Sequence, residues 1–126
     1  MQTRALGSSG LLVSVIGLGC NNFGGMIDGL DPAASRTVIH AALDAGVTLF
    51  DTADSYGADG GSERVLGEAL GARRQDVVLA TKFGMDMNGA NGADHGVRGS
   101  RHYVRRAVEA SLRRLGTDHI DLYQLH

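Results

Sequence analysis

Apolar runs and helix-period stretches alternate along this chain. After an opening segment with a turn at residues 7–10, apolar runs at 11–18, 47–50, 77–81 and 120–125 predict four strands. In the intervening stretches 31–45, 62–70 and 101–115, apolar residues recur every three or four positions, which predicts helices. This order is typical of βαβ units, in which the strands run parallel.

Local signals mark the ends of the predicted helices. Asp31 is a suitable N-cap, with Pro32 at the first helical position, and Gly46 follows the last apolar position of that helix. Ser100 is a suitable N-cap for the third helix, and Gly116 ends it. These signals agree with the helical spacing and strengthen both predictions.

Arginines occupy much of the third predicted helix. Because these arginines lie mainly outside the apolar face of the helix, residues 101–114 are expected to form a solvated outer face. A partner surface is the alternative. Arg113 and Arg114 stand in the last turn, where positive charge suits the negative end of the helix dipole.

The predicted elements describe part of a larger fold. An N-terminal hairpin followed by β-α-β-α-β-α-β leaves sheet edges and apolar faces bare, whereas parallel sheets are normally covered on both faces. We therefore expect residues 1–126 to be the first half of a (β/α)8 TIM barrel, an α/β fold that typically needs about 250 residues. The longest loop, 83–99, is rich in Gly, Asn and Asp, and is expected to be exposed and mobile.

Composition narrows the classes of function. The 126 residues carry 12 Lys and Arg against 14 Asp and Glu, a formal net charge of -2. Nucleic-acid and membrane-surface binding are disfavoured, because both need a clustered basic excess. Cys20 is the only cysteine, which excludes an intrachain disulfide. There is neither a long apolar stretch nor a signal-peptide pattern, so we expect a cytoplasmic protein.

Titratable side chains follow three of the predicted strands. Asp51, Lys82 and His126 stand directly after the second, third and fourth apolar runs. In parallel barrels the carboxyl ends of the strands are where reacting groups converge. Tyr56, five residues past Asp51, can turn back over the same edge. The four groups are complementary: a phenol as acid, an ammonium that stabilises its phenolate, a carboxylate that holds the ammonium, and an imidazole that orients a polar substrate.

Four motifs surround these residues. They are IGLG at 16–19 with FGG at 23–25, FDTADSYG at 50–57, TKFG at 81–84, and GTDHIDLYQLH at 116–126. In these motifs the sequence resembles the aldo/keto reductase family, particularly its bacterial branch similar to the potassium-channel β subunits. The resemblance covers essentially the whole chain, and four motifs in order with fitting spacing are far more specific than any one of them.

The resemblance implies an oxidoreductase with a (β/α)8 barrel that reduces a small aldehyde or ketone with NADPH, with NADH left open. It implies a catalytic tetrad of Asp51, Tyr56, Lys82 and His126. Tyr56 would give its proton to the carbonyl oxygen while hydride passes from the nicotinamide to the carbonyl carbon. Lys82, held by Asp51, would stabilise the phenolate, and His126 would position the carbonyl oxygen. Residues 1–126 alone are expected to be inactive, because the family's pyrophosphate and adenosine contacts lie mainly in the second half of the barrel.

The resemblance also implies contacts with cofactor and substrate. The cofactor-binding candidates are Gly19, Cys20, Asn21 and Asp51. The first three match the loop after the first strand, although Cys20 and Asn21 replace the more usual threonine and tryptophan. Phe23 and Phe83 are candidates for lining the substrate mouth, with core packing as an equal alternative.

Three other interpretations were weighed against this one. A Rossmann fingerprint at residues 17–22 fails because Asn22 stands at the third glycine position and the helix begins only near Asp31. A metal site is not expected, because the histidines lack paired ligand spacing. The remaining alternative is a non-catalytic half-barrel, a binding or regulatory module that self-associates through its exposed strand edges.

Overall fold

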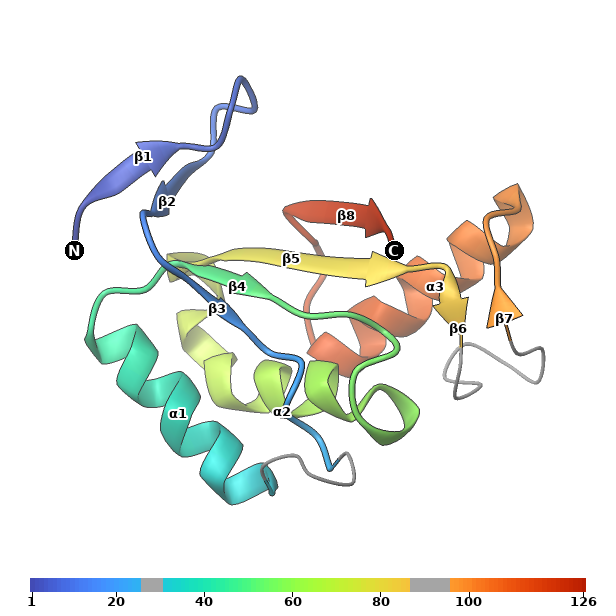
Figure 1. Cartoon of the computed structure of the whole chain (residues 1–126), viewed down its shortest axis with the longest axis horizontal. Coiled ribbons are helices and arrows are strands. Elements are labelled where there is room, and N and C mark those ends of the chain that lie inside the picture. Colours follow the sequence, from blue (N-terminus) through green and yellow to red (C-terminus); the bar gives the residue numbers. More distant parts are fainter. Residues whose placement is uncertain (26–30, 87–95) are drawn as a thin grey trace.

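A four-stranded parallel sheet forms the centre of the fold (Figure 1). The computed structural model describes residues 1–25, 31–86 and 96–126. The strands are β3 (Gly17–Gly19), β4 (Leu49–Asp51), β5 (Val78–Phe83) and β8 (Leu122–Leu125), and they lie in the order β3-β4-β5-β8. All three pairings are parallel, so the carboxyl ends of these strands meet at one edge of the sheet.

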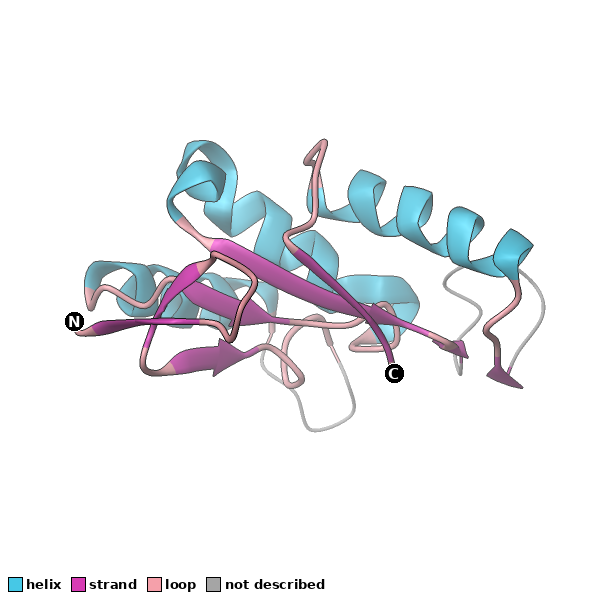
Figure 2. Ribbon diagram, turned by 90° about the horizontal axis from the view of Figure 1, so that it is seen from above, coloured by secondary structure: helices cyan, strands magenta, loops and turns pink. Residues whose placement is uncertain are grey.

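Three helices lie on the same side of this sheet (Figure 2). They are α1 (Pro32–Asp44), α2 (Gly61–Leu70) and α3 (Arg101–Leu115), with α2 packed between the other two. Two short 3-10 helices, η1 (Ala58–Gly60) and η2 (Gly71–Asp76), flank α2. In the part of the chain that the structure describes, no helix has the length and apolarity needed to cross a membrane.

The predicted helix ends are confirmed by their capping contacts. The Asp31 carboxylate accepts a hydrogen bond from the backbone N–H of Ala34 at 2.8 Å, and the Ser100 hydroxyl accepts one from that of Tyr103 at 3.2 Å. Gly116 adopts a φ of 62° at the end of α3, a conformation that is strained for residues with a Cβ. Strong local signals therefore located α1 and α3 to within a residue or two.

The sequence predicted one strand over the first apolar run, 11–18, but this run forms two. It divides into β2 (Leu12–Ser14), which pairs antiparallel with β1 (Thr3–Ala5), and β3, which joins the central sheet. Between them the Ser14 hydroxyl donates to the backbone carbonyl of Ile16 at 2.6 Å, so the chain bends there. The N-terminal hairpin is confirmed, and its second strand, β2, is the first part of the predicted strand.

The loop predicted at 83–99 contains some regular structure. The short strands β6 (Met85–Asp86) and β7 (Gly96–Val97) pair antiparallel, and β5 extends to Phe83. The expected mobility of this loop concerns mainly residues 87–95, which lie outside the described residues.

The main core lies between the sheet and the helices. Its fully buried members include Ile39 from α1, Phe50 from β4, Leu66 from α2 and Leu79 from β5. Complete burial of such side chains contributes roughly 1.5–3 kcal/mol each. This packing fixes β4, β5 and α2 relative to one another, and with them the polar groups at the carboxyl edge of the sheet.

Candidate active site

Asp51 and Lys82 form an ion pair at the carboxyl edge of the sheet. Asp51 is the last residue of β4, and Lys82 lies inside β5, one residue before its end, rather than after the strand as predicted. The Lys82 Nζ donates to Asp51 Oδ2 at 2.8 Å and to the backbone carbonyl of Thr52 at 2.9 Å. The Lys82 side chain is only 15% exposed, so its charge is held close to these acceptors.

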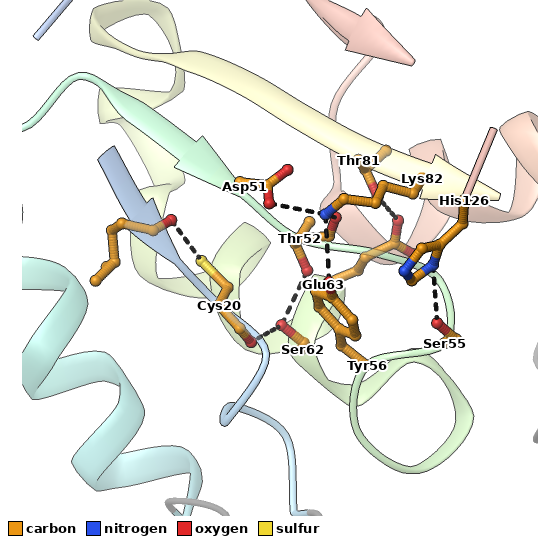
Figure 3. A network of polar contacts seen from close by, with 11 residues as sticks. Cys20, Asp51, Thr52, Ser55, Tyr56, Ser62, Glu63, Thr81, Lys82 and His126 are labelled. Carbon is orange, nitrogen blue, oxygen red and sulfur yellow. Dashed lines mark hydrogen bonds and ion pairs between the residues drawn. The ribbon is translucent and has the colours of Figure 1, made fainter. Parts of the chain in front are cut away.

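Tyr56 turns back toward this ion pair. The third donor contact of the Lys82 Nζ goes to the Tyr56 hydroxyl at 3.4 Å, and the ammonium also lies 4.9 Å from the centre of the Tyr56 ring. All three N–H groups of the ammonium therefore have an acceptor. Figure 3 shows Asp51, Lys82 and Tyr56 pointing toward one another. A phenol with an ammonium beside its oxygen can release a proton with the charge left behind stabilised.

His126 completes the group from the end of β8. Its ring meets the Tyr56 ring edge to face, with 5.6 Å between centroids, and its Nδ1 lies 3.4 Å from the hydroxyl of Ser55. Burial and the neighbouring Lys82 charge lower the pKa of His126, while Asp51 opposes this. A neutral imidazole, which carries one N–H donor and one acceptor nitrogen, is therefore favoured at neutral pH.

The sequence correctly predicted that these four side chains converge, because β4, β5 and β8 are neighbouring parallel strands. The sequence analysis did not predict the layer of polar contacts beneath them. Thr52 and Ser62 are fully buried, with 2.9 Å between their hydroxyl oxygens, and the Ser62 hydroxyl donates to the Cys20 carbonyl at 2.7 Å. No pattern of spacing predicts these contacts, since they join residues from three separate segments.

A buried ion pair underlies the same region. Arg114 Nε donates to Glu63 Oε2 at 2.6 Å, and the Thr81 hydroxyl donates to the other oxygen of Glu63 at 2.6 Å. The Glu63 side chain is 0% exposed and that of Arg114 is 5% exposed. The prediction that Arg114 belongs to a solvated face is therefore wrong. Arg114 stands seven residues after the buried Ala107, on the same face of α3, and its partner Glu63 lies on another helix.

The cofactor-binding candidates differ in exposure. Gly19, the last residue of β3, and Asn21, two residues further on, are exposed, and Gly19 pairs in register with Asp51. Cys20 is 0% exposed, its thiol donates to the Leu18 carbonyl at 3.6 Å, and burial raises its pKa to about 12. Its side chain belongs to the main core and is shielded from any cofactor in this structure, so the predicted cofactor contact at Cys20 could involve only its backbone.

The two substrate-pocket candidates are also buried. Phe23 is 3% exposed and joins the main core. Phe83 is 9% exposed and stacks on Tyr123 with 4.8 Å between ring centroids, in a second core that includes Tyr103. Both side chains pack in a core, the alternative that the sequence left equal to lining the substrate mouth.

Comparison with known proteins identifies the family. The sequence model of the Aldo/keto reductase family matches residues 15–126, which is most of the chain and includes all four converging side chains. The chain belongs to the aldo/keto reductase family. The match confirms the family resemblance, and makes the parallel sheet with its three helices a portion of a TIM-barrel fold.

Relatives of this aldo/keto reductase chain are found among bacterial proteins. The aldo-keto reductase YhdN of Bacillus subtilis is 42% identical over 129 residues, a match that covers 100% of this chain and 38% of that protein. The uncharacterized oxidoreductase YqkF of the same organism is 40% identical over 131 residues and is covered to 39%. The chain thus spans about 40% of the length of these relatives.

Solved structures give the same result. The holo form of aldo-keto reductase AKR11C1 from Bacillus halodurans matches with a TM-score of 0.87 and 42% identity, over 100% of this chain and 40% of that one. An aldo-keto reductase from Klebsiella pneumoniae in complex with NADPH matches with a TM-score of 0.72 and 36% identity, over 91% of this chain and 36% of that one. The aldo/keto reductase chain therefore corresponds to the N-terminal part of such a barrel.

Proposed function

We propose that these residues belong to a reductase that converts an aldehyde or ketone to an alcohol with NADPH, with Tyr56 as the proton donor. The observation that carries the proposal is the contact of the Lys82 Nζ with both the Tyr56 hydroxyl and the Asp51 carboxylate. A related enzyme was solved in complex with NADPH, which supports the choice of cofactor.

The residues at the ends of β3 and β4 fit a nicotinamide nucleotide. One oxygen of Asp51 holds Lys82, yet the Asp51 side chain is 42% exposed and its other oxygen can accept from a sugar hydroxyl. At Gly19, a Cβ would meet no heavy atom within 4 Å, so space is open beside Asp51. We propose that Gly19, Asn21 and Asp51 contact the nicotinamide end of the cofactor.

Bound NADPH would supply the hydride that forms the new C–H bond at the carbonyl carbon. The chain's own residues then handle the proton. Tyr56 gives its hydroxyl proton to the carbonyl oxygen, which becomes the alcohol O–H, and the phenolate that remains lies beside the Lys82 ammonium. Asp51 and the Thr52 carbonyl hold that ammonium in place, so the stabilising charge is oriented before the proton moves.

His126 has a positioning task in this proposal. Its lowered pKa keeps the ring neutral, so that one nitrogen can donate a hydrogen bond to the carbonyl oxygen. The edge-to-face contact with the Tyr56 ring fixes the distance between the two groups that would share the carbonyl oxygen.

The test is the Tyr56→Phe variant of the reductase extended over the length of its relatives. We expect kcat to fall about 100- to 10,000-fold, because general acid catalysis is lost. The Kd for NADPH, measured by fluorescence quenching, should stay close to wild type. Tyr103→Phe, which removes a phenolic hydroxyl in the second core, is the matched control. Equal kcat for Tyr56→Phe and wild type would refute the assigned proton donor.

The reaction is proposed for the whole reductase rather than for residues 1–126 alone. The chain covers about 40% of the solved relative AKR11C1, and no helix among the described residues covers the far face of the sheet. We therefore expect the isolated chain to lack activity. A purified, monodisperse preparation of residues 1–126 that oxidised NADPH in the presence of a carbonyl compound would contradict this expectation.

A further inference from the structure

Ser62 lies where three segments of the candidate site meet. It is the second residue of α2 and is 0% exposed. Its backbone N–H donates to the Tyr56 carbonyl at 3.1 Å, and its hydroxyl donates to the Cys20 carbonyl at 2.7 Å. One residue thus holds both the turn that carries Tyr56 and the loop after β3.

The direction of the remaining hydrogen bond follows from proton counting. The Ser62 hydroxyl has one proton, which goes to the Cys20 carbonyl. The 2.9 Å contact between the Thr52 and Ser62 oxygens must therefore use the Thr52 proton, with Ser62 as the acceptor. The chain of donors therefore runs from Thr52 to Ser62 to Cys20; Figure 3 draws its two contacts as dashed lines.

Thr52 connects this chain to the ammonium. Its carbonyl oxygen accepts from the Lys82 Nζ at 2.9 Å, and its N–H donates to the Ala80 carbonyl at 2.9 Å. The side-chain bond to Ser62 is thus a further constraint on the residue whose carbonyl orients Lys82. Thr52 is fully buried, so water cannot replace the bond.

The backbone around Ser62 is packed closely enough to transmit its position. A Cβ on Gly24 would lie 2.3 Å from the Ser62 nitrogen, and one on Gly57 would lie 3.0 Å from it. Both glycines have positive φ, at 84° and 76°. The segments that meet at Ser62 are therefore in direct backbone contact, so a shift of one segment is passed on to the others.

We propose that Ser62, acting with Thr52, is a positioning residue that holds the Tyr56 turn, the Lys82 ammonium and the loop after β3 in one arrangement. The catalytic part of this inference rests on the proposed reductase function. The structural part does not, because Cys20 reports on the same network through the accessibility of its thiol.

The first experiment measures alkylation of Cys20 by iodoacetamide in the extended reductase, resolved by peptide mass spectrometry. Removal of the Ser62 hydroxyl frees the Cys20 carbonyl, so Ser62→Ala should raise the rate about ten-fold through local opening. The matched control is Ser14→Ala at the opposite end of the sheet. Ser14 is 2% exposed and its hydroxyl likewise donates to a backbone carbonyl, that of Ile16. Equal rates in the two variants would overturn the proposal.

The second experiment measures steady-state kinetics. Ser62→Ala and Thr52→Val should each lower kcat about 10- to 100-fold, because a displacement near 1 Å of the reacting groups has effects of this size. Thr52→Ser keeps the hydroxyl and should retain kcat close to wild type. The double variant should be no slower than Ser62→Ala, since both changes break one chain of bonds. Full kcat in Thr52→Val, or no recovery in Thr52→Ser, would overturn the catalytic part.

The two experiments separate this inference from the proposed function. A wild-type protein without NADPH-dependent reductase activity refutes the proposed function, while the alkylation rates still decide whether Ser62 holds the network. An active wild type whose Ser62→Ala variant keeps its kcat and its slow alkylation refutes the inference and leaves the proposed function standing.

Discussion

Glu63 and Arg114 form an ion pair from which solvent is almost fully excluded, with 2.6 Å between Oε2 and Nε. The pair joins the first turn of α2 to the last turn of α3, and the Glu63 carboxylate also binds the hydroxyl of Thr81. The residue next to Thr81 is Lys82. The pair thus links the packing of two helices to the strand that carries the ammonium.

Removing one partner of this buried ion pair should destabilise the fold. We expect Arg114→Met to lower the free energy of unfolding by about 3–5 kcal/mol, because it leaves the Glu63 carboxylate buried without its partner. Denaturant or thermal unfolding measures the loss. Arg73→Met is the control, since the Arg73–Asp44 pair is exposed at 44% and 75% and should contribute little. Similar losses in the two variants would contradict the importance assigned to the buried pair.

In the extended reductase, the role proposed for Lys82 can be tested apart from that proposed for Tyr56. Lys82→Met removes the charge beside the Tyr56 hydroxyl and should lower kcat about 100-fold or more. Lys82→Arg keeps the charge, but its planar fork does not reproduce the three contacts of one ammonium, so partial recovery is expected. Stopped-flow measurement of NADPH oxidation separates the chemical step from product release. A chemical step as fast in Lys82→Met as in wild type would exclude the role.

The direction of the pKa shift of His126 predicts how its protonation changes stability. Burial and the Lys82 charge lower its pKa, so NMR titration should give a midpoint below 6.5. Between that midpoint and 6.5 the unfolded chain binds more protons than the folded one. The His126 contribution to stability is therefore present above pH 6.5 and is lost as the pH falls through the folded midpoint. Lys82→Met should move the midpoint upward, because it removes a repulsive charge and leaves Asp51. A downward movement would contradict the electrostatic account.

Gly67 offers a test in which helix propensity and packing disagree. Ala is favoured over Gly in a helix interior by about 1 kcal/mol, so Gly67→Ala would stabilise an isolated helix. Here the added Cβ would lie 2.4 Å from the Leu115 carbonyl oxygen, where α2 crosses the end of α3. We expect a net loss of about 1–3 kcal/mol from overpacking, seen as a lower urea midpoint. Gly99→Ala, where nothing lies within 4 Å, should leave the midpoint unchanged.

Local and periodic signals predicted the parts of this fold that depend on nearby residues. Asp31 and Ser100 cap the helices they were expected to cap, because capping uses backbone groups three residues away. The meeting of Asp51, Lys82 and His126 was predictable for a different reason: adjacent parallel strands end at one edge.

The missed features depend on contacts between distant segments. Apolar spacing over 11–18 could not show that Ser14 bends the chain and pairs with Thr48, 34 residues away. Arg114 was assigned to solvent because its partner, Glu63, stands on another helix, and a charged residue signals burial only when both partners are known. Cys20 was assigned to a cofactor by the family resemblance, and the burial of its side chain depends on the core formed around it.

The N-terminal hairpin is attached at the end of the sheet that carries none of the four converging side chains. Reciprocal hydrogen bonds between Ser14 and Thr48 fasten it there, and Met1 remains 57% exposed. Figure 1 shows the N-terminus beside this hairpin and the carboxyl ends of β5 and β8 on the other side. A surface tether or fluorophore coupled through Met1 would therefore hold the molecule by its remote end and leave Tyr56 and His126 accessible to carbonyl compounds in solution.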